Sequence, residues 1–276
     1  MARIINKDTT VCMSLSARPS NFGTRFHNYL YEQLDLNYLY KAFTTNNLKD
    51  AIYGIKALAI RGCAISMPYK EACIEFIDEL DDSVKSIQSV NTIVNTDHYL
   101  KAYNTDYIAV AKLIEENHID NNTPFVLKGS GGMANAVIGA FYDAGFKNGI
   151  IAARNQTKGE ALSKSYGYVW VKNEQDIVPE QAKLIINVTP IGMLGGAEAN
   201  DLAFPQSMIE NADIVFDVVA LPVETPMIKF AKSLNKTIIS GADVAVLQAL
   251  EQFVLYTGVT PSKELVKQAG DFARQG

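Results

Sequence analysis

Residues 124–136 have the sequence Pro-Phe-Val-Leu-Lys-Gly-Ser-Gly-Gly-Met-Ala-Asn-Ala, in which glycines follow a short apolar segment. We expect a β-strand over residues 124–127 and an α-helix over residues 133–144, joined by a glycine turn. Gly129 allows a tight turn, and Gly131 lets backbone N–H groups approach a phosphate at the start of the helix. The spacing departs from the usual G-x-G-x-x-G, and a plain tight turn is the alternative interpretation.

The strand expected next, residues 149–153, is followed by Arg154, Asn155 and Lys158 and by no acidic residue. Sites for NAD usually have Asp or Glu at this place, where the carboxylate accepts a hydrogen bond from the ribose 2′-OH. Arg154 and Lys158 are instead suited to the 2′-phosphate of NADP. Two solvated basic residues are the alternative, but basic side chains at a helix start oppose the helix dipole. The sequence therefore predicts an NADP(H) site.

Strands and helices are expected to alternate on both sides of the glycine turn. Before it, we expect strands at residues 11–16, 39–43 and 63–67, a hairpin of 92–94 with 99–102, and helices at 24–34, 48–57, 71–80 and 106–116. After residue 153, we expect strands at 184–188, 214–219 and 237–239, and helices at 157–166, 243–256 and 262–272. A polar break at residues 120–123 is a candidate surface segment between domains. This alternation predicts an α/β fold with mainly parallel sheets, whose middle part is a doubly wound unit.

Composition and charge limit the class of protein. The 276 residues are 48% hydrophobic and 20% charged, as in globular proteins, and the length suggests two domains. A net charge of −5 provides no basic field for nucleic acid, and no apolar run reaches the roughly 18 residues of a membrane span. The start lacks a signal-peptide core, and the three scattered cysteines and three histidines match neither a disulfide framework nor a metal site. We therefore expect a soluble, cytoplasmic protein without a metal.

Polar side chains follow several of the predicted strands in the first hundred residues. They lie in the segments 14–16, 66–70, 89–92 and 104–106. Ligands of open α/β sheets bind at the carboxyl ends of strands. Each residue also has a simpler explanation: Lys70 as a surface lysine, Asp106 as a helix N-cap, and Asn91 as a turn residue. The spacing alone does not establish that these side chains converge.

Taken together and in order, these segments resemble the shikimate dehydrogenase family. That family has the motifs Ser-x-Ser, V-T-x-P-x-K, A-V-N-T, N-T-D, G-x-G-G-x-x-x-A, an N-R-T-like stretch, N-x-T-x-x-G-M, D-x-x-Y-x-P-x-x-T-P, and Q-A in a late helix. The corresponding residues here are 14–16, 65–70, 89–92, 104–106, 129–136, 154–157, 187–193, 217–226 and 248–249. Each motif alone is weak, but the ordered set through nearly the whole chain is specific to the family.

The resemblance implies a role for each matching residue. Lys70 and Asp106 would form the catalytic pair at the reacting hydroxyl. Asn91 and Gln248 would hold other ring hydroxyls. Ser14 and Ser16 would bind the carboxylate, beside Ser66 at a position where the family usually has Thr. NADP(H) would contact Gly129, Ser130, Gly131, Gly132, Met133, Ala134, Arg154, Asn155, Lys158, Val188, Thr189 and Gly241.

The resemblance also implies a domain plan and an activity. Residues 1–105 would form an α/β substrate domain and residues 106–238 a Rossmann NADP-binding domain, with helices in 239–276 returning to the substrate domain. The expected reaction interconverts shikimate, or a related cyclic hydroxy acid, and its 3-dehydro form, within aromatic amino acid biosynthesis. The expected ligand is a small hydroxy acid, with no nucleic-acid or membrane partner, and the assembly would be a monomer or homodimer.

This sequence departs from the family's pattern at positions expected near substrate or nicotinamide. Ala220 replaces a Tyr that touches the substrate, Asp243 replaces a small residue, usually Gly, and Val244 replaces a Met. Cys12 and Met13 stand where a His is common. We therefore expect a divergent member with weak activity on shikimate, whose natural substrate differs.

Several functions stay open on the sequence alone. As a dehydrogenase residue, Lys70 could accept the proton or donate a hydrogen bond to the developing alkoxide. A quinate or other cyclic polyol-acid dehydrogenase would use the same residues. A non-catalytic NADP(H)-binding regulatory protein is the alternative from another class, although the retained substrate residues argue against it. A methylene-folate dehydrogenase-type enzyme shares the two-domain plan and a catalytic Lys, but the Ser-x-Ser, N-T-D and Q-A segments disfavour it.

Overall fold

The computed structural model describes residues 5–85 and 87–275. The chain divides into two compact units. Unit 1 contains the described residues of Met1–Thr105 and Val246–Gly276, and unit 2 contains Asp106–Ala245. The chain enters unit 2 at the start of helix α5 (Thr105–Glu116) and leaves it within helix α10 (Gly241–Thr257). Unit 1 is therefore built from two separate stretches of sequence.

Unit 1 contains a mixed six-stranded sheet with the strand order β2-β1-β3-β5-β6-β4. The first three strands in this order are parallel, and β5 and β6 form an antiparallel hairpin beside β3. The predicted hairpin is confirmed, with a tighter turn of two residues, Asp97 and His98, whose φ angles of 51° and 66° suit a two-residue connection. The strands are β1 (Thr10–Leu15), β2 (Tyr38–Phe43), β3 (Gly62–Ile65), β4 (Glu79–Leu80), β5 (Thr92–Thr96) and β6 (Tyr99–Tyr103).

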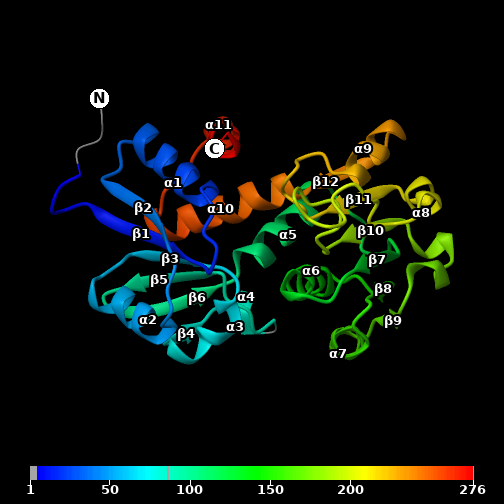
Figure 1. Cartoon of the computed structure of the whole chain (residues 1–276), viewed down its shortest axis with the longest axis horizontal. Coiled ribbons are helices and arrows are strands. Elements are labelled where there is room, and N and C mark those ends of the chain that lie inside the picture. The colour runs from blue at the N-terminus through cyan, green and yellow to red at the C-terminus, as the bar shows by residue number, and fades with distance from the viewer. Residues whose placement is uncertain (1–4, 86, 276) are drawn as a thin grey trace. The chain divides into compact units, whose positions relative to one another are not determined.

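Helices cover both faces of this sheet (Figure 1). Helices α1 (Phe22–Gln33), α10 and α11 (Lys263–Arg274) lie on one face, where Phe26 of α1 and Phe253 of α10 share one buried, largely aromatic core. Helix α2 (Leu48–Ala57) lies on the other face and contributes Ile52 to a second core. The C-terminal helices thus pack on the N-terminal sheet, as the family resemblance implies.

The predicted helix over residues 71–80 is wrong. The chain there forms the short helix α3 (Tyr69–Ala72), a 3₁₀ turn (Ile74–Phe76) and strand β4, before helix α4 (Asp82–Lys85). Apolar residues at 74, 77 and 80 have helical spacing, but Leu80 pairs with Ala102 of β6. Pairing with a neighbouring strand overrides the local pattern here, as it often does for short apolar segments.

Unit 2 contains a fully parallel six-stranded sheet in the order β12-β11-β10-β7-β8-β9. This is the doubly wound Rossmann order, which reverses direction between β7 and β10. The strands are β7 (Phe125–Lys128), β8 (Gly149–Ala152), β9 (Val169–Val171), β10 (Leu184–Asn187), β11 (Ile214–Asp217) and β12 (Thr237–Ser240). Its helices besides α5 and α10 are α6 (Gly132–Asp143), α7 (Gln156–Tyr166), α8 (Gln206–Asn211) and α9 (Pro226–Ser233), and 3₁₀ turns (Glu174–Asp176 and Pro179–Gln181) precede β10.

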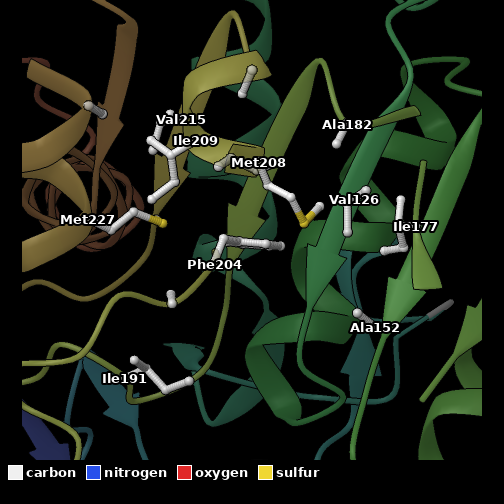
Figure 2. Close-up of a cluster of buried hydrophobic side chains, with 14 of the residues drawn as sticks. Val126, Ala152, Ile177, Ala182, Ile191, Phe204, Met208, Ile209, Val215 and Met227 are labelled. Carbon is white, nitrogen blue, oxygen red and sulfur yellow. The ribbon is translucent and has the colours of Figure 1, made fainter. Parts of the chain in front are cut away.

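One core of unit 2 lies between its sheet and helices α8 and α9. Figure 2 shows Val126 and Val215 from the strands beside Phe204, Met208 and Met227. Each of these five side chains is at most 3% exposed. This packing holds the strands whose carboxyl ends carry the predicted cofactor residues.

One strand and two α-helices of unit 2 have no counterpart among the predictions. They are β9, α8 and α9, which have only three, six and eight residues. Segments this short give little periodic signal. The polar break at residues 120–123 lies inside unit 2, after α5, and not between the two units. Within residues 5–85 and 87–275, no helix has the length and apolar character needed to cross a membrane.

His27 is fully buried in the aromatic core of unit 1. Its ring stacks on that of Tyr40, with centroids 4.4 Å apart and planes within 6° of parallel. Burial lowers the pKa of His27 to about 3, because the imidazolium would lose its hydration there. His27 is therefore neutral in the folded protein at neutral and mildly acidic pH.

We predict that His27 makes the protein sensitive to acid. In the unfolded chain a histidine gains a proton near pH 6.5, whereas folded His27 does so only near pH 3, so stability is lost as the pH falls from 6.5. The loss between pH 7 and pH 5 should be on the order of 2 kcal/mol. Urea unfolding at both pH values measures it, with His27→Phe as the comparison, since phenylalanine keeps the stack and cannot be protonated. The same loss in both proteins would contradict the prediction.

Candidate functional site

The three serines predicted to bind substrate lie at the ends of two neighbouring strands of unit 1. Ser14 is near the end of β1 and Ser16 directly follows it, while Ser66 directly follows β3. The strands are in parallel register, and the N–H of Ser66 donates to the carbonyl of Leu15 over 3.0 Å. The fold therefore brings these serines to one edge of the sheet, the carboxyl edge at which α/β proteins bind ligands.

Asn91 lies beside this edge, one residue before β5. Its carbonyl accepts a hydrogen bond from the N–H of Ile65 in β3, over 2.8 Å. Its side chain is only 2% exposed, and Oδ1 accepts from Thr105 N–H over 2.7 Å, from Thr105 Oγ1 over 3.1 Å and from Thr92 Oγ1 over 2.9 Å. Nδ2 donates to Oε1 of Gln248 in α10 over 3.4 Å. Asn91 and Gln248, here called the amide pair, are thus in direct contact.

Gln252 is a residue of this site that the sequence analysis missed. It lies one helical turn after Gln248 in α10 and is 4% exposed. Its Nε2 donates to Thr92 Oγ1 over 3.1 Å and to the Asn91 carbonyl over 3.5 Å. The spacing of four residues between the two glutamines was the available signal, because such residues share a helix face.

The two predicted catalytic residues lie on short or terminal helical segments. Lys70 is the second residue of α3, and its carbonyl accepts a hydrogen bond from the N–H of Val90 over 2.8 Å. That bond joins α3 to the segment that carries Asn91. Asp106 directly follows Thr105, in the first turn of α5. Lys70 belongs to unit 1 and Asp106 is the first residue of unit 2, so their catalytic pairing stays a prediction.

A pocket of about 280 Å³ lies at the carboxyl ends of strands in unit 2. Its lining includes seven residues predicted to contact the cofactor: Gly129, Ser130, Gly131, Arg154, Asn155, Val188 and Thr189. Five others are not part of this lining: Gly132, Met133, Ala134, Lys158 and Gly241. The pocket thus gathers the loops that follow β7, β8 and β10, at the reversal of strand order where doubly wound sheets bind ligands.

The fold requires glycine at position 129 of the turn but not at positions 131 and 132. Gly129 has φ +126°, and a Cβ there would lie 2.8 Å from Val188 Cγ2, so the fold itself requires glycine. A Cβ on Gly131 or Gly132 would meet nothing within 4 Å, and neither residue has a positive φ. The fold therefore leaves open space beside the start of α6, a helix of 12 residues whose N-terminus favours an anion.

Cationic side chains surround the pocket, and one of them was not predicted. Lys172, directly after β9, lines the pocket together with Arg154. A third cation, Lys128, is paired with Glu174 over 2.7 Å, and both side chains are less than 20% exposed. Arg154 lies 3.8 Å from Glu198, but its side chain is 77% exposed, so solvent weakens this pair. Of these three cations, Lys128 has a close and mostly buried carboxylate partner, whereas Arg154 has only a long, solvent-exposed pair.

Asn155 has a second role besides lining the pocket. Its Oδ1 accepts a hydrogen bond from the N–H of Lys158 over 3.0 Å and caps α7. Asparagine is among the preferred N-cap residues because its side chain satisfies a free N–H of the first turn. The cap fixes where the helix begins and thereby holds Arg154 at the end of β8.

A buried carboxyl group links the loop after β10, which carries Val188 and Thr189, to the loop after β11. Asp217, at the end of β11, has no exposed surface, and burial raises the pKa of its carboxyl group. It accepts hydrogen bonds from Thr225 Oγ1 over 2.6 Å, from Val219 N–H over 3.1 Å and from Asn187 Nδ2 over 2.9 Å. Asn187 Oδ1 in turn accepts from the Thr189 N–H over 3.0 Å. The conformation of both loops depends on this network.

The start of α10 explains two further residues of the predicted site. A Cβ on Gly241 would lie 2.4 Å from the carbonyl oxygen of Val218, so only glycine fits beneath the loop after β11. Asp243 accepts hydrogen bonds from Ser240 N–H over 3.1 Å and from Ser240 Oγ over 2.6 Å. The N–H of Asp243 donates to Ser240 Oγ over 3.3 Å, which completes a capping box. The departure at position 243 therefore serves the helix start.

The other departures that the structure explains lie in cores. Cys12 is fully buried in the aromatic core of unit 1, and Met13, 9% exposed, belongs to the core on the opposite face of the sheet. Val244 is 4% exposed. Nothing in the structure explains Ala220. Within residues 5–85 and 87–275, no group of three or more His, Cys, Asp or Glu residues is placed to hold a metal ion.

Comparison with known proteins identifies the family. The family described as "Shikimate dehydrogenase substrate binding domain" matches residues 21–93. A "Shikimate dehydrogenase-like protein" of Haemophilus influenzae is 56% identical over 271 residues, covering 98% of this chain and 99% of that protein. The shikimate dehydrogenase (NADP(+)) of Methanocaldococcus jannaschii is 34% identical, over 96% of this chain and 98% of that protein.

A solved structure agrees with these sequence matches. It is a shikimate dehydrogenase in complex with NADP+, which is 32% identical and superposes with a TM-score of 0.87 over 97% of this chain and 96% of that one. The sequence matches extend over nearly the full length of both proteins, and the strand-end residues that carry the motifs occupy one edge of each sheet. The chain therefore belongs to the shikimate dehydrogenase family.

Proposed function

We propose that the protein is an NADP-dependent dehydrogenase that interconverts shikimate, or a closely related cyclic hydroxy acid, and its 3-dehydro form. The observation that carries the proposal is the arrangement of Ser16, Ser66 and Asn91 at one edge of a sheet, where backbone hydrogen bonds join their segments. Gln248 of α10 joins Asn91 there through a side-chain hydrogen bond. Unit 1 would then be the substrate domain and unit 2 the cofactor domain. Family membership and the relatives that are named shikimate dehydrogenases (NADP(+)) support this assignment.

The pocket of unit 2 fits a dinucleotide phosphate. The open space at Gly131 and Gly132 leaves room for a pyrophosphate against the N-terminus of α6. Arg154 and Lys172 offer positive charge at the ends of β8 and β9, where the adenosine ribose lies in doubly wound sheets. When bound there, NADP+ supplies the group that accepts the hydride.

The residues of unit 1 would bind the acid and handle its proton. Serine hydroxyls and the N–H groups near them donate hydrogen bonds to a carboxylate, and the amide pair holds ring oxygens. Oxidation of a secondary alcohol also requires loss of the hydroxyl proton. Lys70 would accept this proton or would donate a hydrogen bond to the developing alkoxide. Asp106 would hold the same hydroxyl, so that one proton can be shared among the three groups.

We predict that Lys70→Ala lowers turnover far more than it weakens substrate binding. Positioned acid–base groups contribute roughly 10²–10⁴-fold to rate, so kcat for NADPH formation from NADP+ and shikimate should fall by at least about 100-fold. Lys49→Ala, an exposed lysine of α2, is the matched control and should keep wild-type turnover. Absorbance at high enzyme concentration measures both.

The outcomes separate the functions that the sequence leaves open. Normal turnover of Lys70→Ala would refute the catalytic assignment. Tight NADPH binding without turnover of shikimate, quinate or other cyclic hydroxy acids by the wild-type protein would instead favour a regulatory role.

We further predict that Lys172 shares the 2′-phosphate with Arg154. Loss of one charge-assisted contact should raise KM for NADP+ about tenfold in Lys172→Met and leave KM for NAD+ unchanged. Lys158→Met is the comparison, because its side chain is absent from the pocket lining and its N–H is engaged in the cap of α7. A larger effect on NADP+ at position 158 than at position 172 would overturn the assignment.

A further inference from the structure

We propose that Glu174, held in place by Lys128, accepts a hydrogen bond from the 6-amino group of the cofactor's adenine base and thereby selects this base. This inference deepens the proposed function and rests on it, because it assigns a residue of unit 2 to the base of the dinucleotide. It follows from an ion pair inside the pocket that the binding of phosphates does not explain.

The ion pair joins two strand ends inside the pocket of unit 2. Lys128 is the last residue of β7, Glu174 lies in the segment after β9, and both line the pocket. Lys128 Nζ lies 2.7 Å from Glu174 Oε1, and the two side chains are only 14% and 19% exposed. Every other residue of the segment 172–176 is exposed, so Glu174 alone turns inward. A carboxylate is thus part of a lining whose other charged residues are cations.

Lys128 is fixed by the strand and by the core beneath it. Its carbonyl accepts a hydrogen bond from the N–H of Val188 over 3.0 Å. It follows the core residue Val126 by two positions, so its side chain leaves β7 on the same face (Figure 2). There the ammonium group lies 5.7 Å from the ring centroid of the buried Phe204, within the range of a cation–π contact. The ring and the carboxylate of Glu174 together restrain the ammonium group.

The pair leaves one carboxylate oxygen of Glu174 for a ligand. The bond to Lys128 uses Oε1, and within residues 5–85 and 87–275 no hydrogen bond engages Oε2. An ionised carboxylate has no hydrogen, so Oε2 can only accept. The ammonium group of Lys128 can only donate, and one bond to Glu174 leaves it further hydrogens. The pair therefore offers an acceptor beside donors, and rotation of either group cannot exchange these roles.

The topology of unit 2 indicates which part of the cofactor meets this pair. In doubly wound sheets the pyrophosphate lies at the start of the first helix and the adenosine ribose at the end of the next strand. These places are here the turn at Gly131 and the end of β8 at Arg154. The remaining lining includes Ala152 and Ala153, whose small apolar side chains suit the face of a flat ring. Because a carboxylate repels phosphate, Glu174 suits the uncharged base.

Adenine and hypoxanthine differ in the group that they would present to Glu174. Adenine has an amino group at C6, which donates hydrogen bonds, whereas hypoxanthine has a carbonyl oxygen there, which only accepts. The amino group forms a charge-assisted hydrogen bond with a carboxylate, but the carbonyl oxygen places two acceptors together. The ribose and phosphates hold the base, so hypoxanthine cannot present another edge without losing their contacts. Sites that hydrogen-bond one group reject an analogue that leaves their polar atoms unpaired.

The test compares two dinucleotides of the same shape and charge. Calorimetry at pH 7 measures Kd for NADP+ and for its analogue in which hypoxanthine replaces adenine. No hydroxy acid is added, so the measurement does not depend on turnover. We expect the wild-type protein to bind the hypoxanthine analogue at least about tenfold more weakly than NADP+, the effect of one lost charge-assisted hydrogen bond.

Two variants of Glu174 should reduce this preference. Glu174→Gln provides an NH₂ group that can donate to the carbonyl of hypoxanthine, so the ratio of the two Kd values should fall by at least about fivefold. Glu174→Ala removes the acceptor, and the same fall is expected. A purely structural role of the ion pair would change both Kd values together and leave their ratio unchanged. Glu180→Gln removes an equal charge at an exposed position outside the lining and should keep the wild-type ratio.

Failure of this inference can be told apart from failure of the proposed function. Equal or tighter binding of the hypoxanthine analogue by wild-type protein that also binds NADP+ would overturn the contact with the base and leave the NADP site intact. A wild-type ratio in both folded variants, Glu174→Gln and Glu174→Ala, would overturn the contact as well. No detectable binding of NADP+ by folded wild-type protein would overturn the proposed cofactor and, with it, this inference.

Discussion

The hydrogen bonds of Asn91 join residues from several elements, and the arrangement of the candidate site in unit 1 depends on them. Its N–H donates to Tyr103 in β6, and its carbonyl accepts from Ile65 at the end of β3. Its side chain reaches Thr105 at the start of α5 and Gln248 in α10, and the residue itself leads into β5. A side chain smaller than asparagine would leave several buried polar groups unpaired, at a cost of about 1–3 kcal/mol each. The ends of the strands and the helix that completes the site are therefore positioned by one residue.

Unit 2 uses the same physical device at its own strand ends. Asn187 also directly precedes a functional loop, its Oδ1 is fixed by the N–H of Thr189, and its Nδ2 donates to buried Asp217. A buried carboxylate is costly unless it is well hydrogen-bonded, and Asp217 accepts from three neighbours. In both units an amide whose orientation is set by a backbone N–H converts the end of a strand into a directed polar site. Neither loop needs a metal or disulfide to hold its shape.

Local patterns predicted what is local, and missed what depends on distant partners. Residues 124–136 specify a strand, a turn and a helix through glycine and apolar spacing, and the structure has all three. Parallel pairing of β1 with β3 then brings Ser16 and Ser66 together without further information. The orientation of the Asn91 amide depends on Thr105, 14 residues away across a hairpin, and the motifs that contain these two residues do not reveal their contact. Lys172 follows a strand of three residues, too short to be recognised from its sequence.

The departures from the family's pattern that the structure explains affect packing and the start of a helix. Asp243 completes a capping box, and Cys12 and Met13 lie in cores. A protein that only sensed NADP(H) would need the pocket of unit 2 alone. Such a protein would need neither the nearly buried side chain of Asn91 nor its hydrogen bond to the partly exposed Gln248. The retention of Asn91 and Gln248 therefore favours the proposed hydroxylated substrate over a purely regulatory role.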